Sequence, residues 1–175
     1  MKYLVVIDMQ KDFTTGVLGN PQTAGVVRNV VDKINEFKKN EPDGKIIATL
    51  DTHFDNYMST QEGKNLPVPH CIKDTDGWQL EDDIKNALPS DAATIEKLTF
   101  GSKKLPEYIT SPDEVDEIQI IGVCTDICVI SNAMILKAFY PEIPIKVISA
   151  CCAGVTPESH ENALSAMKSC QIIVE

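Results

Sequence analysis

Short apolar runs alternate with segments of helical character along this 175-residue sequence. The apolar runs have the length and composition of buried strands and are residues 3–7, 45–50, 93–96, 118–121, 145–149 and 172–174. Helices are predicted between them at residues 27–37, 78–88, 125–140 and 157–168. Strands that alternate with helices form right-handed βαβ units. We therefore predict one α/β domain over residues 1–175, a three-layer Rossmann-like fold with a parallel sheet of about six strands and helices on both faces.

The charge balance excludes several classes of partner. The chain has 16 Lys and Arg against 26 Asp and Glu, a net charge of −10, whereas nucleic acids and anionic membranes attract basic surfaces. No apolar run approaches the ~20 residues of a membrane span, and residues 1–8 lack the pattern of a signal peptide. We therefore expect a cytoplasmic protein that acts on a small molecule, with its six cysteines as reduced thiols.

Reactive side chains follow the predicted strands where each strand ends. Asp8 follows the first apolar run, Asp51 and His53 follow the second, and Lys97 follows the third. The fourth run leads into residues 122–128, which carry two cysteines. Because ligands bind outside the carboxyl ends of the strands in open α/β sheets, an acid, a base, a thiol and a possible metal set are expected to meet at one edge.

Cys128 lies about one turn into the helix predicted after the fourth strand. Free backbone N–H groups at a helix start favour a thiolate over a thiol and can hold an oxyanion. A nucleophilic thiol also needs a proton acceptor, and Asp8 can serve, with Lys97 holding the two charges together. The residues alone leave an alternative open, in which Cys124 and Cys128 are two buried thiols in a strand–helix turn.

Three segments resemble, in order, the signature segments of the isochorismatase-like cysteine hydrolases. They are Val5–Phe13 (VVIDMQKDF), Glu96–Lys97 and Gly122–Val129 (GVCTDICV), and together they span most of the chain. Within that superfamily, Leu50–His53 and Pro67–Cys71 resemble the metal-binding segments of nicotinamidases. The resemblance implies the isochorismatase-like fold and a hydrolase that acts on a linear C–N amide bond.

The resemblance also implies catalytic roles, residue by residue. Asp8, Lys97 and Cys128 correspond to the catalytic triad, in which the aspartate accepts the thiol proton and the cysteine attacks the amide carbonyl. The backbone N–H groups of Cys124 and Cys128 correspond to the oxyanion hole. The family carries a cis peptide bond at this turn, which here is the bond between Val123 and Cys124.

The same resemblance implies one divalent metal ion. Its ligands are expected to be Asp51, His53 and His70, with Glu62 as a fourth. A mixed set of carboxylate and imidazole ligands suits zinc, and also manganese or iron. In nicotinamidases the metal takes the pyridine nitrogen of the substrate.

The predicted substrate pocket contains Phe13, which matches the family's aromatic wall, together with Gln10 and Trp78. The chain departs from the pattern at one place. Some nicotinamidases carry a tryptophan shortly before the Pro-His of the metal loop, where this chain has Leu66–Val68. The only tryptophan here, Trp78, follows His70 by eight residues.

The sequence therefore predicts a metal-containing nicotinamidase that converts nicotinamide to nicotinate and ammonia through a Cys128 thioester. Two alternatives remain open. One is a hydrolase of the same superfamily that acts on another small amide or a ureido compound. The other belongs to a different class, a non-enzymatic metal or thiol sensor that uses Cys124 and Cys128. Members of the superfamily often assemble as dimers or tetramers, so a homo-oligomer is expected.

Overall fold

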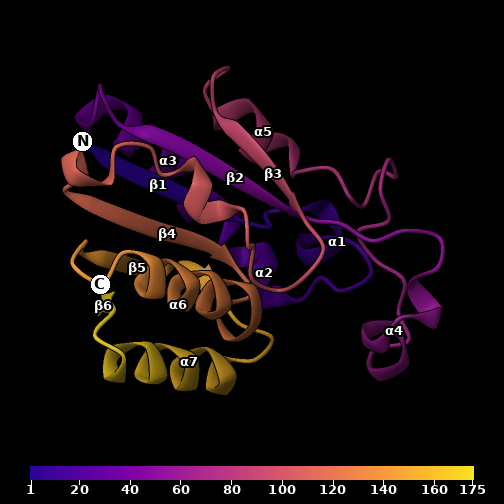
Figure 1. Cartoon of the computed structure of the whole chain (residues 1–175). Helices are drawn as coiled ribbons and strands as arrows, with labels where there is room; N and C mark the ends of the chain where they lie inside the picture. The colour runs from indigo at the N-terminus through magenta and orange to yellow at the C-terminus, as the bar shows by residue number, and fades with distance from the viewer.

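Six parallel strands form a single sheet in the order β3-β2-β1-β4-β5-β6 (Figure 1). The computed structural model describes all residues 1–175. The strands are β1 (Lys2–Ile7), β2 (Lys45–Asp51), β3 (Ala93–Lys97), β4 (Glu117–Val123), β5 (Ile145–Ala153) and β6 (Ile173–Val174). Each overlaps a predicted apolar run, although β5 extends four residues beyond the predicted 145–149, so the predicted parallel α/β sheet is confirmed.

Helices cover both faces of the sheet, and the alternation of side chains along β1 shows how. Tyr3, Val5 and Ile7 belong to an apolar core shared with α6 (Ile130–Phe139) and α7 (Pro157–Ser169). Leu4 and Val6 belong to a second core shared with α3 (Val27–Asn40) and α5 (Asp82–Ala87). Because successive strand residues point to opposite faces, one continuous apolar run supplies both cores.

Several short helical elements carry no periodic apolar stripe and were not predicted. They are α1 (Lys11–Thr14), α2 (Pro21–Gly25), α4 (Gln61–Asn65) and the 3-10 turns η1 (Tyr57–Ser59), η2 (Leu105–Tyr108) and η3 (Pro112–Glu114). A helix of one turn is too short to show a 3.6-residue period. No helix in the structure has the length and apolarity that crossing a membrane requires.

The helix predicted to begin at Trp78 begins instead at Asp82. Residues 77–81 run beside residues 9–12: Lys11 N–H donates to the Gln79 carbonyl at 2.9 Å, and Glu81 N–H donates to the Met9 carbonyl at 2.9 Å. Gln10 and Leu80 form an antiparallel bridge. Residues 76–79 instead form a turn, in which Gln79 N–H donates to the Asp76 carbonyl at 3.1 Å, and pairing with a distant segment holds Leu80 in a bridge before the helix begins.

The strand order reverses at β1, whose neighbours are β2 on one side and β4 on the other. At such a switch point the connections leave in opposite directions and open a crevice at the carboxyl ends of the strands. Gly122 allows β4 to approach β1 here, because its φ is 119° and a Cβ at this position would clash with the Ile7 backbone. The long connection from β2 to α5, which carries α4, extends beyond this edge (Figure 1).

Candidate active site

Lys97 lies at the centre of a buried cluster at the carboxyl edge of the sheet. Its Nζ is 2.7 Å from Asp8 Oδ2 and 3.0 Å from Asp51 Oδ1. The same Nζ is 3.4 Å from Cys128 Sγ. Asp8 follows β1, Lys97 ends β3, and Cys128 lies in the turn after β4. The three residues of the predicted triad therefore meet, and all are buried, with Asp8 0% exposed.

Thr49 positions Asp8 and was not predicted as a site residue. Its hydroxyl donates to Asp8 Oδ1 at 2.7 Å and accepts the Asp8 backbone N–H at 3.2 Å. Asp8 itself adopts a φ of 47°, a left-handed conformation that aspartate tolerates better than most residues. Thr49 reads as an ordinary β-branched strand residue in sequence, so only the pairing of β1 with β2 reveals its role.

Burial sets the resting charges of this cluster. It raises the pKa of the Cys128 thiol well above its ordinary value, and the carboxylate of Asp8 raises it further. Burial also raises the pKa of Asp8, against the opposing charge of Lys97. Burial alone would favour a neutral lysine, but Asp8, Cys128 and Asp51 together raise the pKa of Lys97 well above its usual range. The charge of Lys97 opposes both effects at Cys128, so a thiolate at this position depends on the lysine and not on the turn alone.

The turn that carries Cys128 is a π-helical turn, η4 (Thr125–Val129), which precedes α6. The backbone N–H groups of Ile127 and Val129 both donate to the Cys124 carbonyl at 3.1 Å. The peptide bond between Val123 and Cys124 is cis, as the resemblance implied. Cys124 and Cys128 both line the same cavity.

The connection from β5 to α7 holds this turn from outside. Thr125, which is fully buried, shares a 2.7 Å hydrogen bond with His160 Nδ1 on α7. Asp126 accepts the Val155 backbone N–H at 3.1 Å. His160 is therefore a structural contact of the turn that carries Cys128, distant in sequence from the predicted metal ligands.

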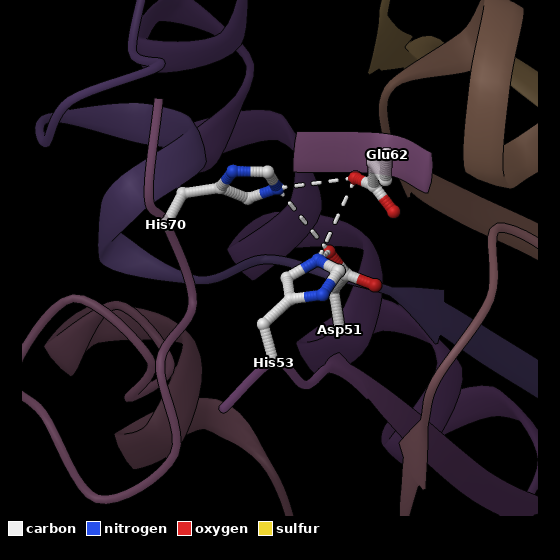
Figure 2. A group of neighbouring side chains, drawn as sticks. All are labelled: Asp51, His53, Glu62 and His70. Carbon is white, nitrogen blue, oxygen red and sulfur yellow. Dashed lines mark hydrogen bonds and ion pairs between the residues drawn. The ribbon is translucent and has the colours of Figure 1, made fainter. Parts of the chain in front are cut away.

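Four side chains from three segments, namely the end of β2, α4 and the loop that follows α4, converge on one point (Figure 2). His53 Nε2 is 3.0 Å from Asp51 Oδ2 and 3.5 Å from Glu62 Oε1. His70 Nε2 is 3.6 Å from each of the same two oxygens. The four ligand atoms lie within 4.8 Å of one another. Two imidazole nitrogens and two carboxylate oxygens at this spacing fit a divalent metal ion.

Neighbouring groups orient the two histidines. His70 Nδ1 is 2.8 Å from the Val68 carbonyl, which only accepts hydrogen bonds, so Nδ1 carries a proton and Nε2 faces the other ligands. The Tyr57 ring packs edge-on against His53 at 4.8 Å and against His70 at 5.1 Å. Tyr57, whose hydroxyl donates to the Leu66 carbonyl at 2.8 Å, is a second supporting residue that sequence patterns did not identify.

Asp51 belongs to both clusters. Its Oδ1 faces Lys97 and its Oδ2 faces the two histidines. Burial opposes ionisation of this carboxyl, but the bonds to His53 and His70 and the charge of Lys97 lower its pKa below the ordinary value. A single ionised carboxylate therefore links the candidate metal set to the candidate triad.

A cavity of about 730 Å³ joins the two clusters. Its lining includes Cys128, all four candidate metal ligands and Phe13. The Phe13 ring is tilted at 57° to the His70 ring with centroids 5.5 Å apart. Phe13 therefore presents an aromatic ring to the cavity beside the candidate ligand His70.

Gln10 and Trp78 do not line this cavity, so the structure contradicts their prediction as pocket residues. Gln10 is fully buried; its side-chain N–H groups donate to the Asp51 and Trp78 carbonyls at 2.8 and 2.9 Å, and its oxygen accepts Asp51 N–H at 2.7 Å. Trp78 Nε1 donates to Thr52 Oγ1 at 3.0 Å. Both side chains support the backbone beneath the metal set, and neither has a free polar group for a ligand.

Replacing Gln10 by alanine tests this supporting role. Because three backbone groups would lose buried partners, we expect the free energy of unfolding to fall by about 2–4 kcal/mol. Denaturant titration measures the change, with Gln22→Ala, at an exposed glutamine, as the control. Unchanged stability combined with weaker ligand binding would instead make Gln10 a pocket residue.

Glu62 offers a separate test, because it is the most exposed of the four candidate ligands, with 22% side-chain exposure. We expect Glu62→Ala to weaken zinc affinity at least about tenfold, since even outer-shell partners of a metal contribute that much. Competition with a fluorescent chelator measures the affinity. Gln61→Ala, at a neighbouring cavity residue outside the candidate metal set, is the control. Equal affinities in the two variants would exclude Glu62 as a ligand.

The fold and the site together define a class of protein. Its members have a parallel α/β fold in which a lysine contacts both a cysteine and an aspartate at the carboxyl edge of the sheet. The family model for the isochorismatase domain matches residues 2–175. The chain therefore belongs to the isochorismatase domain family, and its predicted resemblance to the isochorismatase-like cysteine hydrolases is confirmed.

Relatives within this family agree in fold and length. The nicotinamidase/pyrazinamidase of Mycobacterium tuberculosis is 24% identical over 189 residues, with 98% of this chain and 97% of the relative covered. The crystal structure of the pyrazinamidase of Pyrococcus horikoshii in complex with zinc has a TM-score of 0.83 and 28% identity, covering 99% and 98% of the two chains. The nicotinamidase of Bacillus subtilis has a TM-score of 0.83 and 25% identity over the same shares.

Proposed function

We propose that this hydrolase is a nicotinamidase, which converts nicotinamide and water to nicotinate and ammonia. The observation that carries the proposal is the buried contact of Lys97 with both Asp8 and Cys128, together with the cavity that Cys128 lines beside the four candidate metal ligands. Relatives named as nicotinamidases and pyrazinamidases support the choice of substrate.

In the first proposed step Cys128 attacks the amide. The Asp8 carboxylate accepts the thiol proton while Sγ bonds to the carbonyl carbon, and the carbonyl electrons move to oxygen. The backbone N–H groups of Cys124 and Cys128 hold the resulting oxyanion. Lys97 stays charged throughout and stabilises negative charge on sulfur and carboxylate, which is why a thiol with a raised resting pKa can still react.

In the second proposed step the C–N bond breaks. The oxyanion re-forms the carbonyl, and Asp8 donates its proton to the departing nitrogen, which leaves as ammonia. The acyl group is then a thioester on Cys128. Water attacks this thioester and gives a proton to Asp8; the C–S bond breaks, the thiol regains its proton from Asp8, and nicotinic acid is released as nicotinate at neutral pH.

We propose zinc as the resident ion of Asp51, His53, Glu62 and His70, because the donor set and a relative's zinc complex both favour it. When bound, the ion supplies a Lewis-acidic position that can take a ring nitrogen of the substrate. Phe13 would stack on the ring, and these contacts together would orient the carboxamide toward Cys128.

Two other functions have less support from the site. The same triad can cleave another small amide or a ureido compound, because the chemistry at Cys128 does not depend on the rest of the substrate. A thiol sensor that uses Cys124 and Cys128 would not need Asp8 and Lys97, yet Lys97 contacts both Asp8 and Cys128. A hydrolase therefore accounts for more of the site than a sensor does.

Incubation of the purified, zinc-supplied protein with nicotinamide tests the proposal. We expect equal amounts of ammonia and nicotinate, the first by a coupled assay and the second by chromatography. A parallel panel contains benzamide, pyrazinamide and N-carbamoyl amino acids. Cleavage of an N-carbamoyl compound without cleavage of nicotinamide would overturn the nicotinamidase proposal and support the ureido alternative.

A further inference from the structure

Exposed apolar side chains line the outer part of the active-site cavity, beside the exposed polar residues Gln61, Asn65 and Thr99. Leu98, Phe100, Val155 and Leu66 line the cavity and are 63%, 45%, 48% and 38% exposed. They come from three separate segments: the loop after β3, the loop after β5 and the end of α4. Single exposed apolar side chains are common, but a group around one opening marks a binding surface. We call these four residues the apolar rim.

The charges of the cavity lining limit what can bind there. The lining contains no lysine or arginine, and its only carboxylates, Asp51 and Glu62, belong to the candidate metal set. A carboxylate or phosphate on the substrate would therefore meet no cationic partner at the rim. The net charge of −10 would also repel it. The rim suits an uncharged apolar group.

The size of the cavity leaves room for such a group. At about 730 Å³ it lies in the range of pockets that hold drug-sized ligands. A single-ring carboxamide placed between Cys128 and the metal set, against Phe13, would occupy only the inner part. The rim would then line a space that the ring does not fill.

We propose that this site selects aromatic carboxamides that carry an uncharged apolar substituent on the ring, with the apolar rim as the subsite for that substituent. The inference rests on the proposed function and narrows its substrate class. The substrate is the favoured occupant because the rim is continuous with the reacting thiol in one cavity. A second protein chain on the same four side chains would cover residues that line the cavity together with Cys128.

Binding to a Cys128→Ala protein supplied with zinc tests the proposal without requiring turnover. Calorimetry compares nicotinamide with its 5-propyl and 6-propyl derivatives and with 5-carboxynicotinamide. We expect the better propyl isomer to bind about tenfold more tightly than nicotinamide, because a propyl group would be partly buried, and the carboxylate to bind more weakly. The proposal would be overturned if both propyl isomers bound more weakly than nicotinamide, or if 5-carboxynicotinamide bound as tightly as the propyl derivatives. It would also be overturned if none of these compounds bound detectably.

Rim variants in the same Cys128→Ala background locate the effect. The Leu98→Ser, Phe100→Ser double change should reduce the tenfold advantage of the propyl derivative to about twofold or less. Phe139→Ser is the matched control, because Phe139 is 61% exposed on α6 and lies outside the cavity. An undiminished advantage in the double variant would overturn the assignment to the rim.

Ammonia release by the protein with Cys128 intact separates the two proposals. Cleavage of nicotinamide without the expected propyl preference in binding would sustain the nicotinamidase proposal and overturn the rim subsite. If the expected binding order were found but no pyridine carboxamide released ammonia, the rim subsite would be sustained and the nicotinamidase proposal would be overturned.

Discussion

Replacing Cys128 by alanine is expected to reduce hydrolysis of nicotinamide by at least about 10⁴-fold, because the atom that forms the covalent bond is removed. The side chain is buried against Lys97 and is not one of the four candidate metal ligands. Zinc content should therefore stay at the level of the unaltered protein. Initial rates of ammonia release and metal analysis of the same sample measure the two quantities.

Cys152→Ala is the matched control for this prediction. Cys152 is buried in the same apolar core as Cys128 but does not line the cavity. Its replacement should lower stability modestly and leave the rate nearly unchanged. Residual activity above about 1% in Cys128→Ala would exclude this thiol as the nucleophile, and loss of zinc would place it in the metal site.

Replacing His53 by alanine is expected to produce the opposite pattern: loss of bound zinc with retention of a reactive thiol. His53 Nε2 faces both candidate carboxylate ligands, so its removal leaves three ligands and should weaken zinc affinity more than about 100-fold. Lys97 still contacts Asp8 and Cys128 without it. Iodoacetamide should therefore still label the Cys128 peptide, as mass spectrometry can show.

His160→Ala provides the control, since His160 contacts Thr125 and is not part of the metal set. It should retain zinc in full. If His53→Ala kept both zinc and activity, the proposed metal centre would be wrong. If it lost zinc together with all labelling of Cys128, the two clusters would depend on each other more strongly than the shared Asp51 carboxylate implies.

The sequence by itself determined the parallel α/β fold and most of the candidate site. Strands buried on both faces need continuous apolar runs, and such runs are visible without any knowledge of packing. The carboxyl ends of those strands meet at one edge, so Asp8, Asp51 and Lys97 were expected to be close. His70 and Glu62 followed from resemblance to a known family, because their loop has no period from which to place them.

Only the tertiary structure decided which side chains face the cavity and which support it. Gln10 and Trp78 were predicted to bind substrate. The Gln10 side chain instead donates hydrogen bonds to two backbone carbonyls, which lie 41 and 68 residues further along the chain. Thr49 positions Asp8 across the same separation of 41 residues. The direction of the Cys128 pKa shift also depends on burial by distant elements. Hydrogen-bond partners and desolvation arise from contacts between segments far apart in the chain. Local sequence patterns therefore do not predict them.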